Sequence, residues 1–235
     1  MATSYGQFCP VAKAMELLDE RWTLLVVREL MVGSRHFNAL RRGVPRMSPA
    51  LLSKRLHTLI RAGVVERHRD GNRMTYHLTT SGKELVPVVV AIGQWGIRWI
   101  GELGDEDLDP HLLLWDVHRN IDLEAVADGR TVVRFVFTDV AGPARDWWLV
   151  INTDGVDVRD FDPGYDVRLT VETGLRTLTL IWRGDLAWPE AQRSQDMVLH
   201  GDRSACRAFP RWLKLSPLAG TPRPVGALEG RRRRD

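Results

Sequence analysis

The apolar positions of residues 10–63 recur at helical spacing and predict four short helices. The first begins at Pro10, since proline is tolerated in the first turn of a helix. The second carries its apolar positions along residues 22–30 and ends near Gly33. Ser34 is expected to cap a third helix that Gly43 closes.

The fourth helix is the most strongly delimited. Ser48 suits the N-cap, Pro49 the first helical position, and Gly63 the C-terminal stop. One face is apolar (Leu52, Leu56, Leu59 and Ile60), and the other is small or polar (Ala50, Ser53, Lys54, His57 and Arg61).

Two β-capable runs joined by Asp70-Gly71 follow this helix and predict a hairpin with arginines near its tip. Helices followed by a basic hairpin form the winged helix-turn-helix pattern. A helix with a small polar face fits the major groove, about 12 Å wide, and a basic hairpin beside it reaches the flanking backbone or minor groove. The expected DNA-binding residues are Ser48, Ala50, Ser53, Lys54, His57, Arg67, Arg69, Asn72 and Arg73. The alternative is a winged helix used only for protein contacts.

Charge supports the DNA-binding interpretation. Residues 1–100 contain 15 Lys and Arg against 7 Asp and Glu, whereas residues 101–235 contain 18 against 23. This split predicts an anionic partner for the first half of the chain only, although solvated charges can also cluster by chance.

Residues 81–100 predict a long helix capped by Ser81, with Pro87 near its start. Its apolar surface is too large for a small domain to leave uncovered. We expect it to form a homodimer through Val88, Ile92, Trp95 and Trp99. The alternative is packing against the second half of the chain.

The second half alternates in the manner of strands, over residues 131–140, 147–152, 156–160 and 165–173. Helices capped by Thr173 and Asp202, a short one from Pro189, and a strand over residues 197–202 complete the pattern. Hairpins that precede helices predict an α+β fold with a mostly antiparallel sheet. The expected domains are residues 1–102 and 107–215, with a disordered basic tail at 216–235.

The first half also resembles the HxlR family of bacterial winged-helix transcription regulators. The resemblance covers residues 5–100 and rests on Cys9-Pro10, "ERWTLLVVREL", "SPALLSKRL" and "AGVVER". It implies a cytoplasmic dimer that binds double-stranded DNA at a two-fold symmetric operator. Some family members use a cysteine at the position of Cys9 as a redox sensor. A small, inert residue is the interpretation we favour here, since no resolving cysteine is visible.

The second half more loosely resembles the sterol-carrier-protein-like fold, a sheet whose helices cover a lipid-sized cavity. The resemblance is strongest over "YDVRLTVETGLRTLTLIWRGDLAW" and the segment that follows. It implies a pocket for a hydrophobic or aromatic effector, lined by Phe135, Phe137, Trp148, Leu178, Trp182, Met197 and Phe209. The alternative is that these residues fill a core. Strand alternation also directs Trp147 and Trp148 to opposite faces of the sheet.

Several classes are disfavoured. No apolar run approaches the roughly 18 residues of a membrane helix, and the N-terminus lacks a secretion signal. The histidines and cysteines lack metal-ligand spacing, no cofactor motif is present, and no nucleophile-plus-base constellation indicates an enzyme. The rival hypotheses are a regulator whose second domain is purely structural, and a second domain that acts as a lipid carrier or small enzyme.

Overall fold

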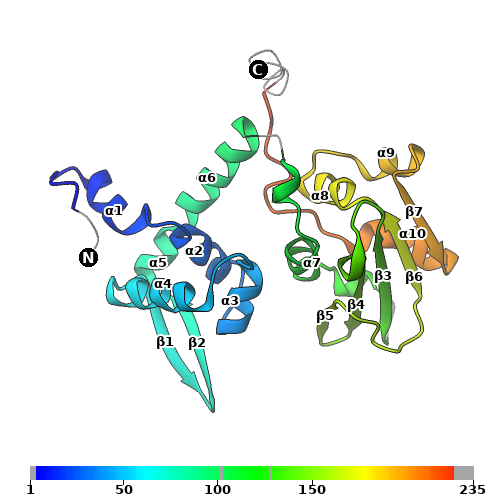
Figure 1. The fold of residues 1–235 in the computed structure, drawn as a ribbon, viewed down its shortest axis with the longest axis horizontal. Coiled ribbons are helices and arrows are strands. Elements are labelled where there is room, and N and C mark those ends of the chain that lie inside the picture. Colours follow the sequence, from blue (N-terminus) through cyan, green and yellow to red (C-terminus); the bar gives the residue numbers. More distant parts are fainter. Residues whose placement is uncertain (1–3, 101–102, 127–128, 225–235) are drawn as a thin grey trace. The chain divides into compact units, whose positions relative to one another are not determined.

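The computed structural model describes residues 4–100, 103–126 and 129–224 (Figure 1). The chain divides into two compact units, Met1–Gly96 and Ile97–Asp235. Each unit contains its own cluster of buried apolar side chains. In the described residues, no helix combines the length and the apolarity that crossing a membrane requires.

The first unit has the predicted winged helix-turn-helix order. Its elements are α1 (Pro10–Leu18), α2 (Thr23–Met31), α3 (Phe37–Gly43), α4 (Pro49–Arg61), β1 (Val65–Asp70), β2 (Arg73–Leu78), α5 (Thr80–Glu84) and most of α6 (Val86–Trp99).

Helix α4 begins and ends where its sequence predicts. The Ser48 side chain accepts a hydrogen bond from the backbone N–H of Leu51, and Pro49 occupies the first turn. Gly63 follows with a φ of +71°, a conformation that glycine adopts without steric cost. Leu52, Leu56 and Leu59 are buried, so the apolar stripe packs into the core as predicted.

Two predicted caps in this unit are wrong. Ser34 is buried and donates a hydrogen bond to Glu29, while α3 begins after His36 without a side-chain cap. Ser81 lies inside α5, whose cap is Thr79, which accepts from the N–H of Gly82. The predicted single helix is also two, because α5 ends at Glu84 and Pro87 lies in the first turn of α6.

The second unit is α+β. Its elements are η1 (Asp105–Asp107), α7 (Pro110–His118), η2 (Leu123–Ala125), β3 (Thr131–Phe137), η3 (Gly142–Arg145), β4 (Asp146–Asn152), β5 (Gly155–Arg159), β6 (Leu169–Thr173), α8 (Leu175–Arg183), α9 (Trp188–Arg193), β7 (Met197–Gly201) and α10 (Arg203–Trp212). The strand order is β5-β4-β3-β6-β7. Among the strand pairs that the structure describes in this sheet, only β3–β6 is parallel, which confirms the mostly antiparallel sheet.

The two faces of this sheet differ as strand alternation requires. Trp147 belongs to the main core, together with side chains of α7, α8 and α10. Trp148 packs instead with Val132 and Val150 in a separate small cluster. Trp148 therefore cannot share a pocket with the other predicted lining residues, and that assignment is wrong.

Three local features of this unit depart from the sequence-based expectation. Helix α7 was not expected, although Asp109 caps it and Pro110 opens it. Thr173 does not cap α8, because its hydroxyl donates to the Asp196 carbonyl. The carboxylate of Asp139, which follows β3, accepts from the N–H groups of Leu175 and Arg176 instead.

The predicted disordered tail is ordered where the structure describes it. The N–H of Ser216 donates to the Trp182 carbonyl, and Arg223 forms an ion pair with Asp185. Residues 225–235, which include the terminal run of arginines, lie outside the described residues, as do residues 101–102 at the end of the first predicted domain.

Candidate nucleic-acid interface

The outer face of α4 is open to solvent. Ser48, Ala50, Ser53, Lys54 and His57 are all exposed. Within the described residues, no carboxylate lies within ion-pair distance of Lys54 or His57. Small and polar side chains therefore surround one unpaired lysine, a surface suited to base edges and phosphates.

The inner face of α4 is held by a charged residue as well as by leucines. Arg55 is 6% exposed, its Nε donates to the Arg21 carbonyl at 3.0 Å, and it forms an ion pair with Glu20. These contacts fix α4 to the link between α1 and α2. The leucine spacing of α4 alone does not predict this anchor, but an arginine on its leucine-rich face is a visible signal for a buried partner.

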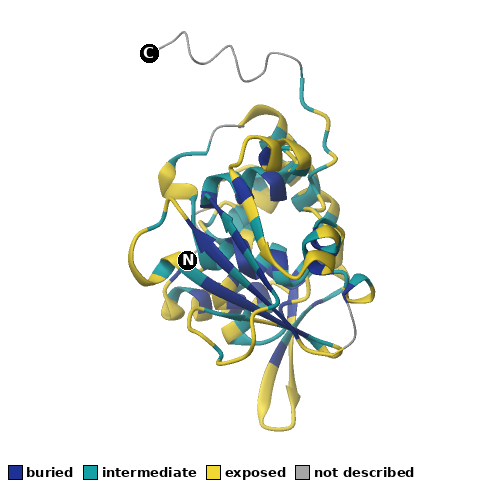
Figure 2. Cartoon of the chain, turned by 90° about the vertical axis from the view of Figure 1, so that its right-hand side faces the viewer, coloured by how far each residue is buried: buried dark blue, intermediate teal, exposed yellow. Residues whose placement is uncertain are grey.

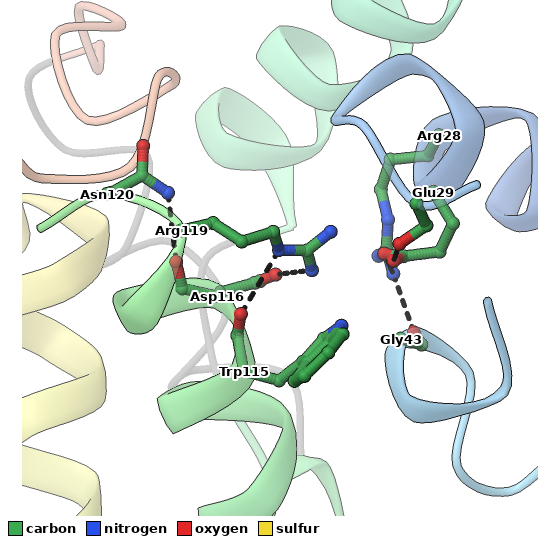
Figure 3. Close-up of polar contacts among 8 residues, drawn as sticks. Arg28, Glu29, Gly43, Trp115, Asp116, Arg119 and Asn120 are labelled. Atoms are coloured by element: carbon green, nitrogen blue, oxygen red, sulfur yellow. Dashed lines mark hydrogen bonds and ion pairs between the residues drawn. The ribbon is translucent and has the colours of Figure 1, made fainter. Parts of the chain in front are cut away.

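Helices α2 and α3 are joined by a second polar cluster (Figure 3). Arg28 donates to the Gly43 carbonyl at 2.9 Å and pairs with Glu29, whose side chain is fully buried. A Cβ at Gly43 would lie 1.9 Å from the Glu29 carboxylate carbon. Gly43 thus does more than end a helix: it leaves room for the buried carboxylate.

The β1–β2 hairpin, the wing, is exposed along most of its length (Figure 2). Gly71 has a φ of +56° and occupies the first of the two turn positions, where a two-residue hairpin favours glycine. Arg67, Arg69 and Arg73 are exposed. Arg69 Nε donates to the nearby Gly71 carbonyl.

The register of the wing separates its arginines. In the strand register, Arg67 lies opposite Tyr76 and Arg69 opposite Met74, whereas Arg73 lies opposite Asp70. Because alternate residues of a strand point to opposite faces, Arg67 and Arg69 lie on one face and Arg73 on the other. The wing therefore presents positive charge on both faces.

The base of the wing is fixed to the helices. Tyr76 N–H donates to the Arg35 carbonyl at 2.8 Å, and His36 forms a bridge with Thr75. The rings of His68 and His77 meet edge to face, with centroids 5.3 Å apart. Burial lowers the pKa of His77 below its ordinary value, and the positive charge of Arg35 lowers it further.

Helix α6 leaves large apolar side chains exposed. Val88, Ile92, Trp95 and Trp99 are 43–56% exposed, whereas Leu85, Val86 and Val89 pack against the core of the first unit. The residues predicted to form a dimer therefore lie on the outer side of the helix.

Cys9 is half-buried and free, and it occupies the N-cap position of α1.

The predicted effector pocket is occupied by its own lining residues. Phe135, Phe137, Leu178, Trp182, Met197 and Phe209 belong to one buried cluster, and Phe209 contacts the rings of Phe135, Trp188 and Trp212. They fill the core, as the alternative held. A groove of about 520 Å³ lies beside β7 and α10, and Met197 is the one predicted pocket residue among those that line it. The described residues contain no group of three or more His, Cys, Asp or Glu suited to a metal ion.

Comparison with known proteins bears on the first unit. The family model for the HxlR-like helix-turn-helix matches residues 17–103. Over 99 residues the chain is 37% identical to the uncharacterized HTH-type transcriptional regulator YvaP of Bacillus subtilis, which covers 40% of this chain and 92% of that protein. Over 95 residues it is 40% identical to the uncharacterized HTH-type transcriptional regulator Rv3095 of Mycobacterium tuberculosis, which covers 38% of this chain and 58% of that protein.

Among solved structures, the stereoselective inverting sec-alkylsulfatase Pisa1 from Pseudomonas sp. aligns with 48% of this chain and 17% of its own. Its identity is 20% and its TM-score 0.38, so the alignment carries no argument about function. The sterol-carrier-like resemblance of the second unit thus stays a prediction. The match that spans nearly the whole of YvaP decides the family: the chain belongs to the HxlR-like helix-turn-helix transcriptional regulators.

Proposed function

We propose that this protein regulates transcription as a homodimer that binds a two-fold symmetric site in duplex DNA. Helix α4 enters the major groove and reads base edges through Ala50, Ser53, Lys54 and His57, with Ser48 at its start. The observation that carries the proposal is the open outer face of α4, with an unpaired lysine, beside an exposed wing with three arginines.

The wing enters the neighbouring minor groove. The minor groove is about 6 Å wide, so a phosphate backbone lies on each side of an inserted hairpin. Arg67 and Arg69 face one backbone and Arg73 the other, with Asn72 at the tip. The separation of these arginines by the strand register supports this placement.

The dimer forms through α6. Its exposed apolar side chains are the surface that a second copy would cover. Two recognition helices must lie about 34 Å apart to meet successive major grooves, so tight binding requires the dimer. Ile92→Asp combined with Trp99→Asp should give a monomer by light scattering with greatly weakened DNA binding. A double variant that stays dimeric would place the interface elsewhere.

DNA binding itself is tested on duplexes selected by the protein from a random pool. The Lys54→Ala, Arg69→Ala, Arg73→Ala triple variant should lose most of its affinity. A matched triple variant of exposed arginines in the second unit, Arg145→Ala, Arg193→Ala and Arg211→Ala, removes the same charge and should bind as the wild type does. Equal affinity of the first variant and the wild type would refute the proposed interface.

A second proposal concerns the second unit, as the sensor of a hydrophobic small-molecule effector in the cytoplasm. Since the predicted pocket residues fill the core, the groove beside β7 and α10 is what supports a sensor. For regulation, the effector must bind the DNA-competent and DNA-incompetent dimers unequally. The rival hypotheses, a structural second unit and a lipid carrier or small enzyme, predict no change in DNA affinity on binding a ligand.

A further inference from the structure

The groove of the second unit combines apolar and polar walls. Met197 and Leu199 of β7 and Pro210 of α10 supply apolar surface. Gln192 of α9, Gln195 of the following turn and Arg207 of α10 supply hydrogen-bond donors. Its volume of about 520 Å³ lies within the range that small-molecule sites occupy.

The backbone at the groove offers further polar groups. Strand β7 lies at the edge of the sheet and pairs only with β6 among the described strands, so its outer N–H and C=O groups have no ladder partner there. Three consecutive residues of this strand line the groove, which places the groove along the strand edge. Pro210 has no N–H, so it cannot donate the helical hydrogen bond to the Cys206 carbonyl.

The groove carries positive charge, although the second unit as a whole has a net negative charge. Seven arginines of the second unit lie within 4.0 Å of a carboxylate: Arg119, Arg134, Arg159, Arg168, Arg176, Arg183 and Arg223. Within the described residues, Arg207 has no such partner, and neither have Arg203 and Arg211. These three share one face of α10 because they are spaced by four residues. No acidic side chain lines the groove.

The turn that carries Gln195 is unusual. Gln195 has a φ of +62°, one of two non-glycine residues with positive φ among the described residues. This conformation is uncommon for residues with a side chain, and such strain is often found at binding sites. It coincides here with a donor in the groove wall.

We infer that this groove binds a small carboxylic acid with an apolar body. Arg207 and the two glutamines receive the carboxylate, and Met197, Leu199 and Pro210 contact the body. A neutral lipid would leave the charge of Arg207 without a partner. A second copy that paired along the edge of β7 would bring the like-charged arginines of the two copies together. The site deepens the proposed sensor role, since it names the class of effector, but its binding can be measured without DNA.

Binding is tested by calorimetry on the full chain with 2-naphthoate and decanoate, which place the same carboxylate on a flat and a flexible body. The neutral 2-naphthamide is the matched ligand control. Arg207→Gln should weaken binding of the acids about tenfold, the effect of losing one charged hydrogen bond at a partly exposed site. Arg145→Gln, an exposed arginine of the same unit, should leave it unchanged. Equal affinity of acid and amide, or no binding by either acid, would overturn the inference.

The place of binding is tested without any variant. Cys206 lines the groove, whereas Cys9 lies in the first unit, and both thiols are free. A bound acid should slow alkylation of Cys206 by iodoacetamide and leave Cys9 unaffected, as measured by mass spectrometry. Binding without protection of Cys206 would place the acid elsewhere and overturn the site. Protection with unchanged DNA affinity would confirm the site and refute the sensor role alone.

Discussion

Replacing Arg73 with alanine tests the wing directly. In the proposed dimer on DNA, the substitution should remove one phosphate contact from each protomer, so two contacts would be lost per complex. Arg73 is exposed, and within the described residues neither the cross-strand Asp70 nor any other carboxylate lies within ion-pair distance of it. Each lost contact should reduce the slope of log affinity against log salt by about 0.9, or about 1.8 for the dimer.

This slope predicts a measurable effect. Between 50 and 200 mM NaCl, the wild type should lose about twelvefold more affinity than Arg73→Ala does, since a fourfold salt change is raised to a power of about 1.8. Fluorescence anisotropy of a labelled duplex at several salt concentrations gives both slopes. The loss should be similar on unrelated sequences, because phosphates carry no base identity.

Arg145→Ala is the control, because it removes an exposed arginine from the second unit. Its slope should match that of the wild type. If Arg73→Ala weakens binding while the slope stays the same, Arg73 does not contact phosphate. If neither affinity nor slope changes, the wing does not contact DNA and the insertion of both its faces into the minor groove is refuted.

Three further predictions concern stability, each measured by urea denaturation. Ser48→Ala should destabilise the first unit by about 1 kcal/mol through loss of the α4 cap, whereas Ser53→Ala, exposed within the same helix, should have little effect. Phe209→Ala should cost about 3–5 kcal/mol, because Phe209 is fully buried among aromatic rings; a loss near that of the exposed Phe161→Ala would indicate an open pocket. The depressed pKa of His77 means that the folded state favours the neutral imidazole. The contribution of His77 to stability should therefore be fully present above its ordinary pKa of 6.5 and be lost as pH decreases through the folded pKa. His77→Gln should flatten that decline, and an unchanged pH profile would exclude His77 as its source.

The sequence predicted best those features that neighbouring residues determine. Ser48, Pro49 and Gly63 delimit α4 because caps and stops act within one helical turn. Gly71 fixes the hairpin because a two-residue turn is likewise determined by its own residues. The opposed faces of Trp147 and Trp148 follow from strand alternation alone.

The features that it missed depend on distant partners. Asp139 caps α8 across the intervening strands, so no local pattern around Leu175 reveals it. Serine is a residue type that often caps helices, yet the hydroxyl of Ser34 donates its hydrogen bond to the buried Glu29. The aromatic residues of the second unit suit a core and a pocket equally by composition, and only their packing distinguishes the two.

The strand order of the second unit has a consequence for the synthesis of the protein. Strand β3 lies at the centre of the sheet and completes its pairing only when β6 is available, and the edge strand β7 ends at Gly201. The elements of the first unit, in contrast, are all present once the chain has been synthesised to Trp99. At ribosomal rates of about 5–20 residues per second, roughly 5–20 s separate completion of the first unit from emergence of the last strand. A nascent chain is thus expected to display a folded DNA-binding unit well before its sheet closes.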